Sequence, residues 1–385
     1  MHRRVLSSLC YLLSLVILLL HHTSLTASAE PLASRASFPS VSAQGAILLE
    51  TSGNRVIYEK NAHVRLPMAS TTKIMTAIVA MEHGDTCMQV TVPAAAVGVE
   101  GSSIYLYEGE ILTLEHLLYA LLLESANDAA VAIAIAVSGS VESFVELMNQ
   151  KAATLDLRNT HFVNPHGLDH EDHYTTAADL ARLADYCIQN ELFRTIVSTQ
   201  RMTIPLHDQE GVRLLLNHNR LLRSYEGTIG LKTGFTKRSG RCLVSAAQRD
   251  GVTLISVTLN APDDWDDHRS MFDYGFSQYT SILLQPAGTY TRSIPLIGNR
   301  QSKVEIYNPN EVRVILPRTH GEIQISCHGP RWIGGMITKG RVLGQLIWTC
   351  DGEIIAVEPL IARSSVYPLS YKYPWWKRLL SLFTG

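Results

Sequence analysis

Residues 67–81 read Pro-Met-Ala-Ser-Thr-Thr-Lys-Ile-Met-Thr-Ala-Ile-Val-Ala-Met, and this stretch decides how the rest of the chain is interpreted. Its apolar second half predicts a buried helix over 70–81. Ser70 and Lys73 are three positions apart, so they share a helix face and the lysine amine can reach the serine hydroxyl. A lysine activates a serine as its base only if burial or nearby positive charge lowers the lysine pKa. The helix N-terminus adds N–H groups where an oxyanion would develop.

Two further short motifs carry groups suited to the same chemistry. Ser125-Ala-Asn127 lies at the break between two apolar segments, so its hydroxyl could relay a proton and its amide could hold a substrate carbonyl. In Lys232-Thr-Gly234, a strand would offer Lys232 and Thr233 to an anionic group, and Gly234 would let a substrate backbone approach closely. Each motif alone also fits an ordinary helix cap or turn. Their order and spacing together are those of penicillin-recognising serine enzymes.

The segments around these motifs predict an α+β domain over 42–283, because strands at both ends bracket a helical middle. From about residue 286 to 362, short strand-like runs alternate with Gly, Pro and Asn turns, which predicts a second, all-β domain. The predicted strands of the first domain are 45–49, 55–59, 241–248 and 252–259, and its predicted helices are 70–81, 113–124, 128–137, 140–155, 176–189 and 263–279.

The N-terminus has the order of a secretory signal. Arg3 and Arg4 precede an apolar run, and Ala27-Ser-Ala29 follows it, so we expect 1–29 to be a signal peptide and 30–41 a linker. The run is shorter than the ~20 residues that a spanning helix needs. An uncleaved N-terminal anchor remains the alternative. The protein is therefore expected on the outer side of the cytoplasmic membrane.

Composition excludes several classes of function. The 385 residues are 46% hydrophobic and 18% charged, which supports a sizeable core, and the net charge of −2 argues against a nucleic-acid partner. The chain has no phosphate loop of the Walker or dinucleotide type. Its six cysteines lack the paired Cys-x-x-Cys spacing of a zinc site. We expect no metal and no cofactor.

Some residues that attract attention have simpler interpretations. His166, His170 and His173 resemble metal ligands, but Pro165 and Gly167 disfavour the helix that would align them, so we expect a polar loop. Cys242 is expected to be a small core residue on a strand. Cys327 and Cys350 both fall in the β domain, where pairing is open because the sequence does not give their separation.

Beyond the three motifs, the chain resembles the D-alanyl-D-alanine carboxypeptidases, the low-molecular-mass penicillin-binding proteins that trim peptidoglycan stem peptides. The resemblance covers residues from about 40 to 384. The chain departs from the family pattern at Phe235 and 239–242, which are positions that the family also varies. Lys237-Arg238 makes the stretch after the lysine motif more basic than expected. The segments that carry it, besides the motifs, are 144–149, 160–168, 173–181, 334–344 and 358–362.

The resemblance implies an acyl-transfer mechanism without a cofactor. Ser70 would attack the carbonyl of the penultimate D-Ala while Lys73 takes its proton. Backbone N–H groups of Ser70 and Phe235 would form the oxyanion hole, and Ser125 would help return the proton to the leaving D-Ala. The terminal carboxylate would be held by Lys232 and Thr233. A β-lactam would mimic the D-Ala-D-Ala terminus and acylate Ser70.

Three alternatives stay open on the sequence. A class A β-lactamase would need an E-x-x-L-N element, and the nearest candidate, Glu146-Leu-Met-Asn149, has the wrong register. A non-catalytic penicillin-binding sensor would normally carry a spanning helix and a signalling domain. A D,D-endopeptidase of the same fold is harder to distinguish.

The last residues, 373–385, predict a membrane-associating tail. At about 100° per residue, Trp375 and Trp376 fall on one helix face with the apolar residues that follow, and Lys377 and Arg378 lie on the other. Such a segment suits the headgroup level of a bilayer, although a helix docked on the protein itself is the alternative.

Overall fold

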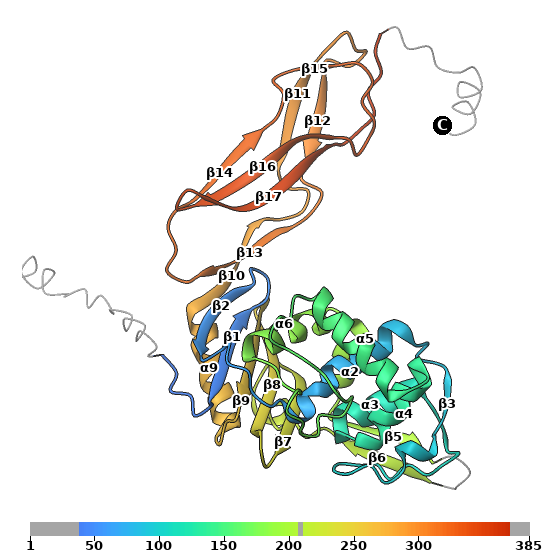
Figure 1. Ribbon diagram of the computed structural model, residues 1–385. Helices are drawn as coiled ribbons and strands as arrows, with labels where there is room; N and C mark the ends of the chain where they lie inside the picture. Colours follow the sequence, from blue (N-terminus) through green and yellow to red (C-terminus); the bar gives the residue numbers. More distant parts are fainter. Residues whose placement is uncertain (1–37, 207–210, 370–385) are drawn as a thin grey trace, which may run out of the picture. The chain divides into compact units, whose positions relative to one another are not determined.

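The computed structural model describes residues 38–206 and 211–369. The first domain contains a five-stranded antiparallel sheet with the strand order β2-β1-β9-β8-β7 (Figure 1). The predicted hairpins and the α+β architecture are confirmed. The strands of this sheet are β1 (Gly45–Glu50), β2 (Arg55–Lys60), β7 (Thr228–Thr236), β8 (Gly240–Arg249) and β9 (Val252–Leu259).

The sheet forms because its strands alternate apolar residues between two covered faces. On β1, Ile47 and Leu49 contact the helical region, whereas Ala46 and Leu48 pack in the cluster with α9 (Asp264–Gln278). Successive strand side chains point to opposite faces, so a strand buried on both sides reads as a continuous apolar run. The sheet therefore separates two cores, and Figure 1 shows α9 on one side and the helices between residues 73 and 188 on the opposite side.

The helical middle contains the predicted helices with shifted boundaries. The predicted 70–81 helix begins as a 3-10 turn, Ala69–Thr72, and continues as α2. The predicted 113–124 helix is α3 followed by a π-helical turn, Ala120–Glu124. Thr176 caps α6 by accepting the Asp179 N–H, as its sequence indicated. The α-helices of this region are α2 (Lys73–His83), α3 (Leu114–Tyr119), α4 (Asn127–Ser138), α5 (Val141–Thr154), α6 (Ala177–Ile188) and α7 (Glu191–Ser198).

Several short elements were not anticipated from the sequence. They are α7, α8 (Leu221–Ser224), β3 (Gln89–Thr91), β4 (Ile111–Thr113), the 3-10 turn Ala94–Ala96, and the hairpin of β5 (Arg201–Pro205) with β6 (Val212–Leu216). Most are too short to show a periodic pattern. Among the described residues, no single helix is long and apolar enough to span a membrane; only α4 and α5 together pass that test, and they are bent by 86°.

The C-terminal strands build a six-stranded sheet with the order β14-β16-β17-β12-β11-β15, and β10 pairs separately with β13. This confirms the all-β character predicted after residue 286. Its core is aliphatic around Trp348 and Leu346. The strands are β10 (Tyr279–Gln285), β11 (Thr291–Ile297), β12 (Lys303–Tyr307), β13 (Val312–Pro317), β14 (Ile323–His328), β15 (Ile333–Gly334), β16 (Val342–Cys350) and β17 (Glu353–Ala362).

The cysteines are free in the part of the chain that the structure describes. Cys327 and Cys350 lie on neighbouring strands, but Cys327 pairs in register with Leu346, so the two cysteines do not form a disulfide. Cys242 is fully buried on β8, which confirms it as a core residue, and burial raises the pKa of its thiol to about 11. The predicted signal peptide 1–29 and the tail 373–385 lie outside the described residues.

Candidate active site

Ser70 and Lys73 lie where the 3-10 turn passes into α2. Ala69 has a left-handed φ of 47°, and Lys73 is the first residue of α2. Lys73 Nζ is 3.0 Å from Ser70 Oγ. The contact that the three-residue spacing predicted is therefore present, although a 3-10 turn, which also brings i and i+3 together, provides it.

Lys73 is completely buried, and its amine has three oxygen neighbours. Besides Ser70 Oγ, Nζ donates to Asn127 Oδ1 at 2.7 Å and to the His166 carbonyl at 2.6 Å. Burial lowers the pKa of Lys73 well below its usual value, and the charge of Lys232 lowers it further, while Asp128 acts in the opposite direction. Both conditions that the sequence analysis set for a lysine base are met here.

The Ser125 motif lies at the break between the π-helical turn and α4, as predicted. Ser125 takes a left-handed φ of 62°, so the chain reverses there and α4 begins at Asn127. Asn127 Nδ2 donates to the Glu100 carbonyl at 2.5 Å, which directs Oδ1 toward Lys73. Ser125 lines the same cleft as Ser70. The structure thus brings the first two motifs together.

The lysine motif lies on β7, an edge strand of the five-stranded sheet. Lys232 is buried, its Nζ donates to the Thr233 carbonyl at 2.9 Å, and burial lowers its pKa to about 7 against the opposing charge of Glu124. Gly234 packs against the turn that carries the nucleophile, because a Cβ there would lie 3.0 Å from the Ser70 nitrogen. The absence of a side chain at Gly234 therefore allows β7 to pack against the turn that carries Ser70.

A cleft of about 330 Å³ joins these residues. Its walls come from the 3-10 turn, the Ser125 break, β7 and the first turn of α9. The lining residues are Ser70, Ser102, Ser125, His218, Arg220, Thr233, Gly234, Phe235, Arg241, Asp264 and Trp265. Lys73, Asn127 and Lys232 lie behind this surface and contact it through hydrogen bonds.

The segment containing the three histidines is a loop, as predicted, but two of them are not simply polar surface. The His166 backbone carbonyl holds Lys73, and Gly167, with a φ of +94°, packs so tightly that a Cβ would clash with the Ala69 carbonyl at 2.0 Å. His173 is buried with Nε2 2.7 Å from Thr72 Oγ1, and burial lowers its pKa to about 3. Of the residues in these contacts, only Gly167 could be singled out from the sequence, as a residue that disfavours a helix.

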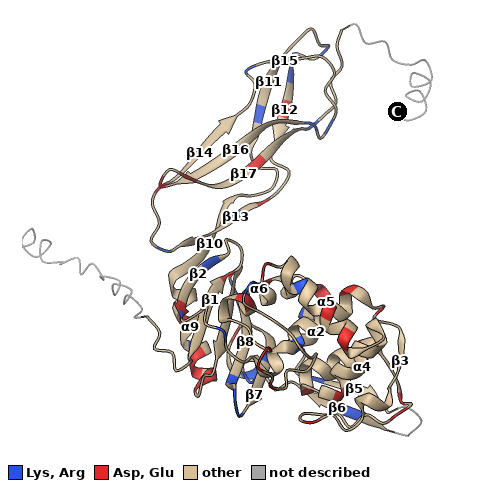
Figure 2. Cartoon of the chain, in the orientation of Figure 1, with Lys and Arg blue, Asp and Glu red and all other residues tan. Residues whose placement is uncertain are grey.

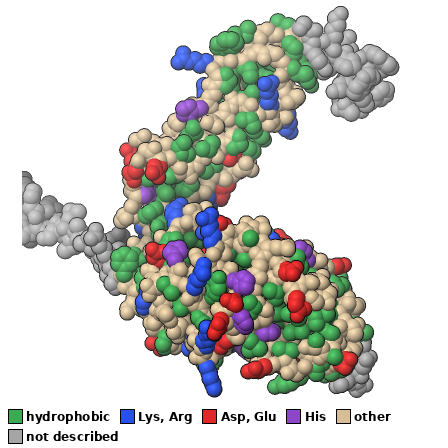
Figure 3. Space-filling model, viewed as in Figure 1, with side chains coloured by type: hydrophobic (Ala, Val, Ile, Leu, Met, Phe, Trp, Pro, Cys, Tyr) green, Lys and Arg blue, Asp and Glu red, His purple; other side chains and the backbone are tan. Residues whose placement is uncertain are grey.

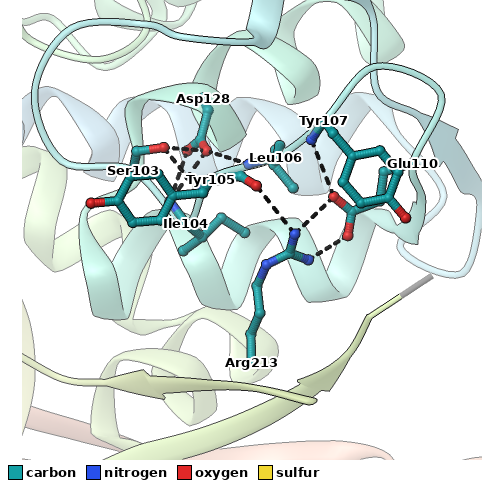
Figure 4. Close-up of polar contacts among 8 residues, drawn as sticks. All are labelled: Ser103, Ile104, Tyr105, Leu106, Tyr107, Glu110, Asp128 and Arg213. Carbon is teal, nitrogen blue, oxygen red and sulfur yellow. Dashed lines mark hydrogen bonds and ion pairs between the residues drawn. The ribbon is translucent and has the colours of Figure 1, made fainter. Parts of the chain in front are cut away.

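A network of buried carboxylates shapes the wall beside the Ser125 motif (Figure 4). Asp128 accepts hydrogen bonds from Ser103 Oγ at 2.6 Å and from the Ile104 and Leu106 N–H groups at 3.2 and 3.0 Å. The loop that contains Ser102 is thereby fixed next to Asn127, whose N–H donates to the Ser102 carbonyl.

A second carboxylate in Figure 4 attaches the β5–β6 hairpin to the same wall. Glu110 is fully buried and forms a two-pronged ion pair with Arg213 of β6, whose Nη2 also donates to the Tyr105 carbonyl at 3.3 Å. At the other end of β6, Glu124 accepts the Leu216 N–H and lies 3.2 Å from His218 Nε2. Sequence analysis did not identify Glu110, Glu124 or His218.

The fold and the cleft define a serine acyl-transferase in which a buried lysine contacts the serine. The model of the D-alanyl-D-alanine carboxypeptidase family matches residues 32–263. The chain belongs to this family. It is a serine-type D-Ala-D-Ala carboxypeptidase, a penicillin-binding protein that acts on peptides ending in D-Ala-D-Ala, and the β-lactamase and sensor alternatives are thereby set aside.

Similar proteins support this assignment over most of the chain. The D-alanyl-D-alanine carboxypeptidase DacF of Bacillus subtilis is 31% identical, and the alignment covers 84% of this chain and 86% of DacF. The crystal structure of penicillin-binding protein 5 from Haemophilus influenzae matches with a TM-score of 0.66 at 25% identity, covering 86% of this chain and 99% of that one. The Streptomyces K15 DD-transpeptidase structure is 33% identical, has a TM-score of 0.59, and covers 62% of this chain and 98% of that one.

Proposed function

We propose that Ser70 is the nucleophile and Lys73 its base. The observation that carries this proposal is the set of three contacts at Lys73 Nζ. A neutral amine has two N–H groups and one lone pair. The Asn127 and His166 oxygens take the two N–H groups, so the lone pair is left for the proton of Ser70 Oγ, 3.0 Å away. The lowered pKa of Lys73 favours this neutral form.

In the proposed reaction, Ser70 Oγ attacks the carbonyl carbon of the penultimate D-Ala while its proton passes to Lys73. The oxyanion is stabilised by the N–H groups of Ser70 and Phe235, which lie on the two segments that Gly234 allows to pack together. Collapse of the tetrahedral intermediate breaks the C–N bond, and the proton reaches the departing amine from Lys73 through Ser125. Water then hydrolyses the Ser70 ester by the reverse sequence of proton transfers.

Lys232 and Thr233 are proposed to hold the terminal carboxylate. Thr233 lines the cleft, and the buried Lys232 supplies positive charge directly behind it. A charged donor contributes more to a hydrogen bond with a carboxylate than a neutral donor does. Peptides with a free terminal acid are therefore the proposed substrates, and amidated peptides are expected to bind poorly.

The test of the nucleophile uses a fluorescent penicillin and a diacetyl-Lys-D-Ala-D-Ala peptide. We expect one covalent adduct on the wild type, located by mass spectrometry in the peptide that contains Ser70, and release of D-Ala from the substrate. Ser70→Ala should lose both while its circular dichroism spectrum stays unchanged. Ser102→Ala is a matched control, because Ser102 also lines the cleft but is not next to Lys73. An adduct on another serine would overturn the assignment.

We also propose that the exported protein is held on the outer face of the cytoplasmic membrane by residues 373–385. The proposal rests on the sequence. Two adjacent tryptophans share one helix face with apolar residues, and Lys377 and Arg378 lie on the other face. Tryptophan rings favour the headgroup level, and basic side chains attract anionic lipid. A stem peptide of the cell wall is accessible from that position.

A further inference from the structure

The cleft extends past the catalytic residues to a group that the proposed mechanism does not use. Arg220 precedes α8, Arg241 lies on β8, and Trp265 belongs to the first turn of α9, yet all three line the cleft with Ser70. Both guanidinium carbons lie 5.9 Å from the centre of the Trp265 ring. Two cations beside one aromatic ring, next to a nucleophile, form a binding surface with a definite chemical preference.

The charge of this group is not balanced. Arg241 is paired with Asp264, at 2.9 Å through Nε and 2.8 Å through Nη2. Among the described residues, the Arg220 guanidinium has no hydrogen-bond or ion-pair partner; its contact is with the Trp265 ring. The other acids in the first turn of α9 are engaged elsewhere, Asp266 with Arg269 and Asp267 with Ser42. One guanidinium is therefore available for an anion.

More positive charge lies next to it at the β7–β8 turn. Lys237 and Arg238 are exposed there, and they are the basic pair that the sequence analysis noted as unusual. Figure 2 shows Lys and Arg positions at this end of β7 and β8, and Figure 3 shows basic side chains on this part of the surface near acidic and histidine side chains. One acid contacts this end of β7: Asp169 Oδ1 accepts the Thr236 hydroxyl at 3.0 Å.

The direction of the substrate follows from the proposed function, on which this inference rests. The terminal carboxylate is held at Thr233 and the scissile carbonyl at the Phe235 N–H, so the peptide runs antiparallel to β7. The residue before D-Ala-D-Ala then lies beyond Phe235, toward the β7–β8 turn. Arg241 is the register partner of Phe235 on β8, so the cationic group is close to that residue.

We propose that Arg220, Arg241 and Trp265 form a subsite for a side-chain carboxylate on the residue that precedes D-Ala-D-Ala. Arg220 supplies the free guanidinium, Asp264 keeps Arg241 in position, and the Trp265 ring holds both guanidinium planes. A guanidinium binds a carboxylate through two parallel N–H donors, which a carboxamide cannot match. The enzyme would thus distinguish stem peptides with a free acid at this residue from amidated ones.

The experiment compares three peptides of matched length. They are Nα-acetyl-L-2-aminoadipyl-D-Ala-D-Ala, the same peptide with its side-chain carboxylate converted to a carboxamide, and Nα-acetyl-L-lysyl-D-Ala-D-Ala. D-Ala release gives kcat/KM for each. We expect the acid to exceed the amide by about fivefold to thirtyfold at low salt and the lysyl peptide to be the poorest, with the differences shrinking at high salt.

Three variants make the test specific. Arg220→Gln should reduce the acid-to-amide ratio to below about twofold, and Arg220→Lys should restore part of it. Arg269→Gln is the control, because this partly exposed arginine lies on α9 but is paired with Asp266 and does not line the cleft. The rate of penicillin acylation reports that each variant is folded.

Two results would overturn the subsite. One is an equal kcat/KM for the acid and the amide in the wild type, and the other is an undiminished preference in Arg220→Gln. Failure of the proposed function would look different, since no peptide would then release D-Ala and Ser70 would carry no adduct.

Discussion

At the scale of the residue, the site depends on two buried lysines that are kept in different states. Burial and, after it, the charge of Lys232 lower the pKa of Lys73 well below the usual value. Lys232 has Glu124 as a compensating charge, and its pKa falls only to about 7. One amine can therefore act as a base while the other keeps enough charge to bind an anion. When the surroundings of two ionisable groups move their pKa values apart, one site can supply both a base and a charged binding group.

The pKa of Lys232 predicts how activity depends on pH. Lys232 is charged below pH 7, so kcat/KM for free-acid peptides should fall as the pH rises through about 7 and the carboxylate loses its cation. Glu124→Gln removes the charge that raises this pKa, so the fall should move to lower pH. The measurement is a pH profile of kcat/KM, with the exposed Glu142→Gln as control. An unmoved profile in Glu124→Gln would contradict the role of Glu124.

At the scale of the element, the cleft wall depends on the β5–β6 hairpin, which is joined to its neighbours through buried Glu110. Removing one partner of a buried ion pair leaves an uncompensated charge, at a cost of about 3–5 kcal/mol. Arg213→Met should therefore lower the free energy of unfolding by about that amount. Combining it with Glu110→Gln should recover much of the loss, because the buried charge is then gone.

Urea unfolding followed by circular dichroism measures this coupling as a double-mutant cycle. Arg201→Met is a suitable control, since Arg201 is exposed on β5 of the same hairpin. Strictly additive effects of the two substitutions would show that the ion pair does not hold the hairpin.

At the scale of the whole molecule, the proposed membrane tail predicts how the protein partitions. Deleting 373–385 should release active enzyme into the soluble fraction, because the apolar face and the basic residues of the tail are lost together. Trp375→Ser with Trp376→Ser should weaken membrane binding without changing D-Ala release. Sedimentation with anionic vesicles measures both. If the truncated protein still sediments with membranes, the anchor is the N-terminal apolar run.

The type of chemistry and the class of fold could both be predicted from local patterns in the sequence. Ser70 and Lys73 could be paired from spacing alone, because three residues bring side chains together in either a 3-10 turn or an α-helix. Four of the five strands in the first domain's sheet, β1, β2, β8 and β9, were equally readable, because they form two pairs of strand-like runs that are each joined by a short turn sequence. Short strand-like runs separated by Gly, Pro and Asn turns similarly predicted the β domain. These patterns involve residues that are close together in the sequence, so they can be recognised without knowledge of the fold.

The groups that complete the site from distant parts of the chain became identifiable only in the folded molecule. The His166 carbonyl is a backbone atom, and no side-chain pattern marks it as the group that holds Lys73. Glu124 and His218 are far apart in sequence, and they meet because β6 ends beside the Ser125 break. Arg220, Arg241 and Trp265 come from three separate elements. Contacts of this kind arise when a sheet and its helices pack together, and the sequence records the packing surfaces but not which residues meet across them.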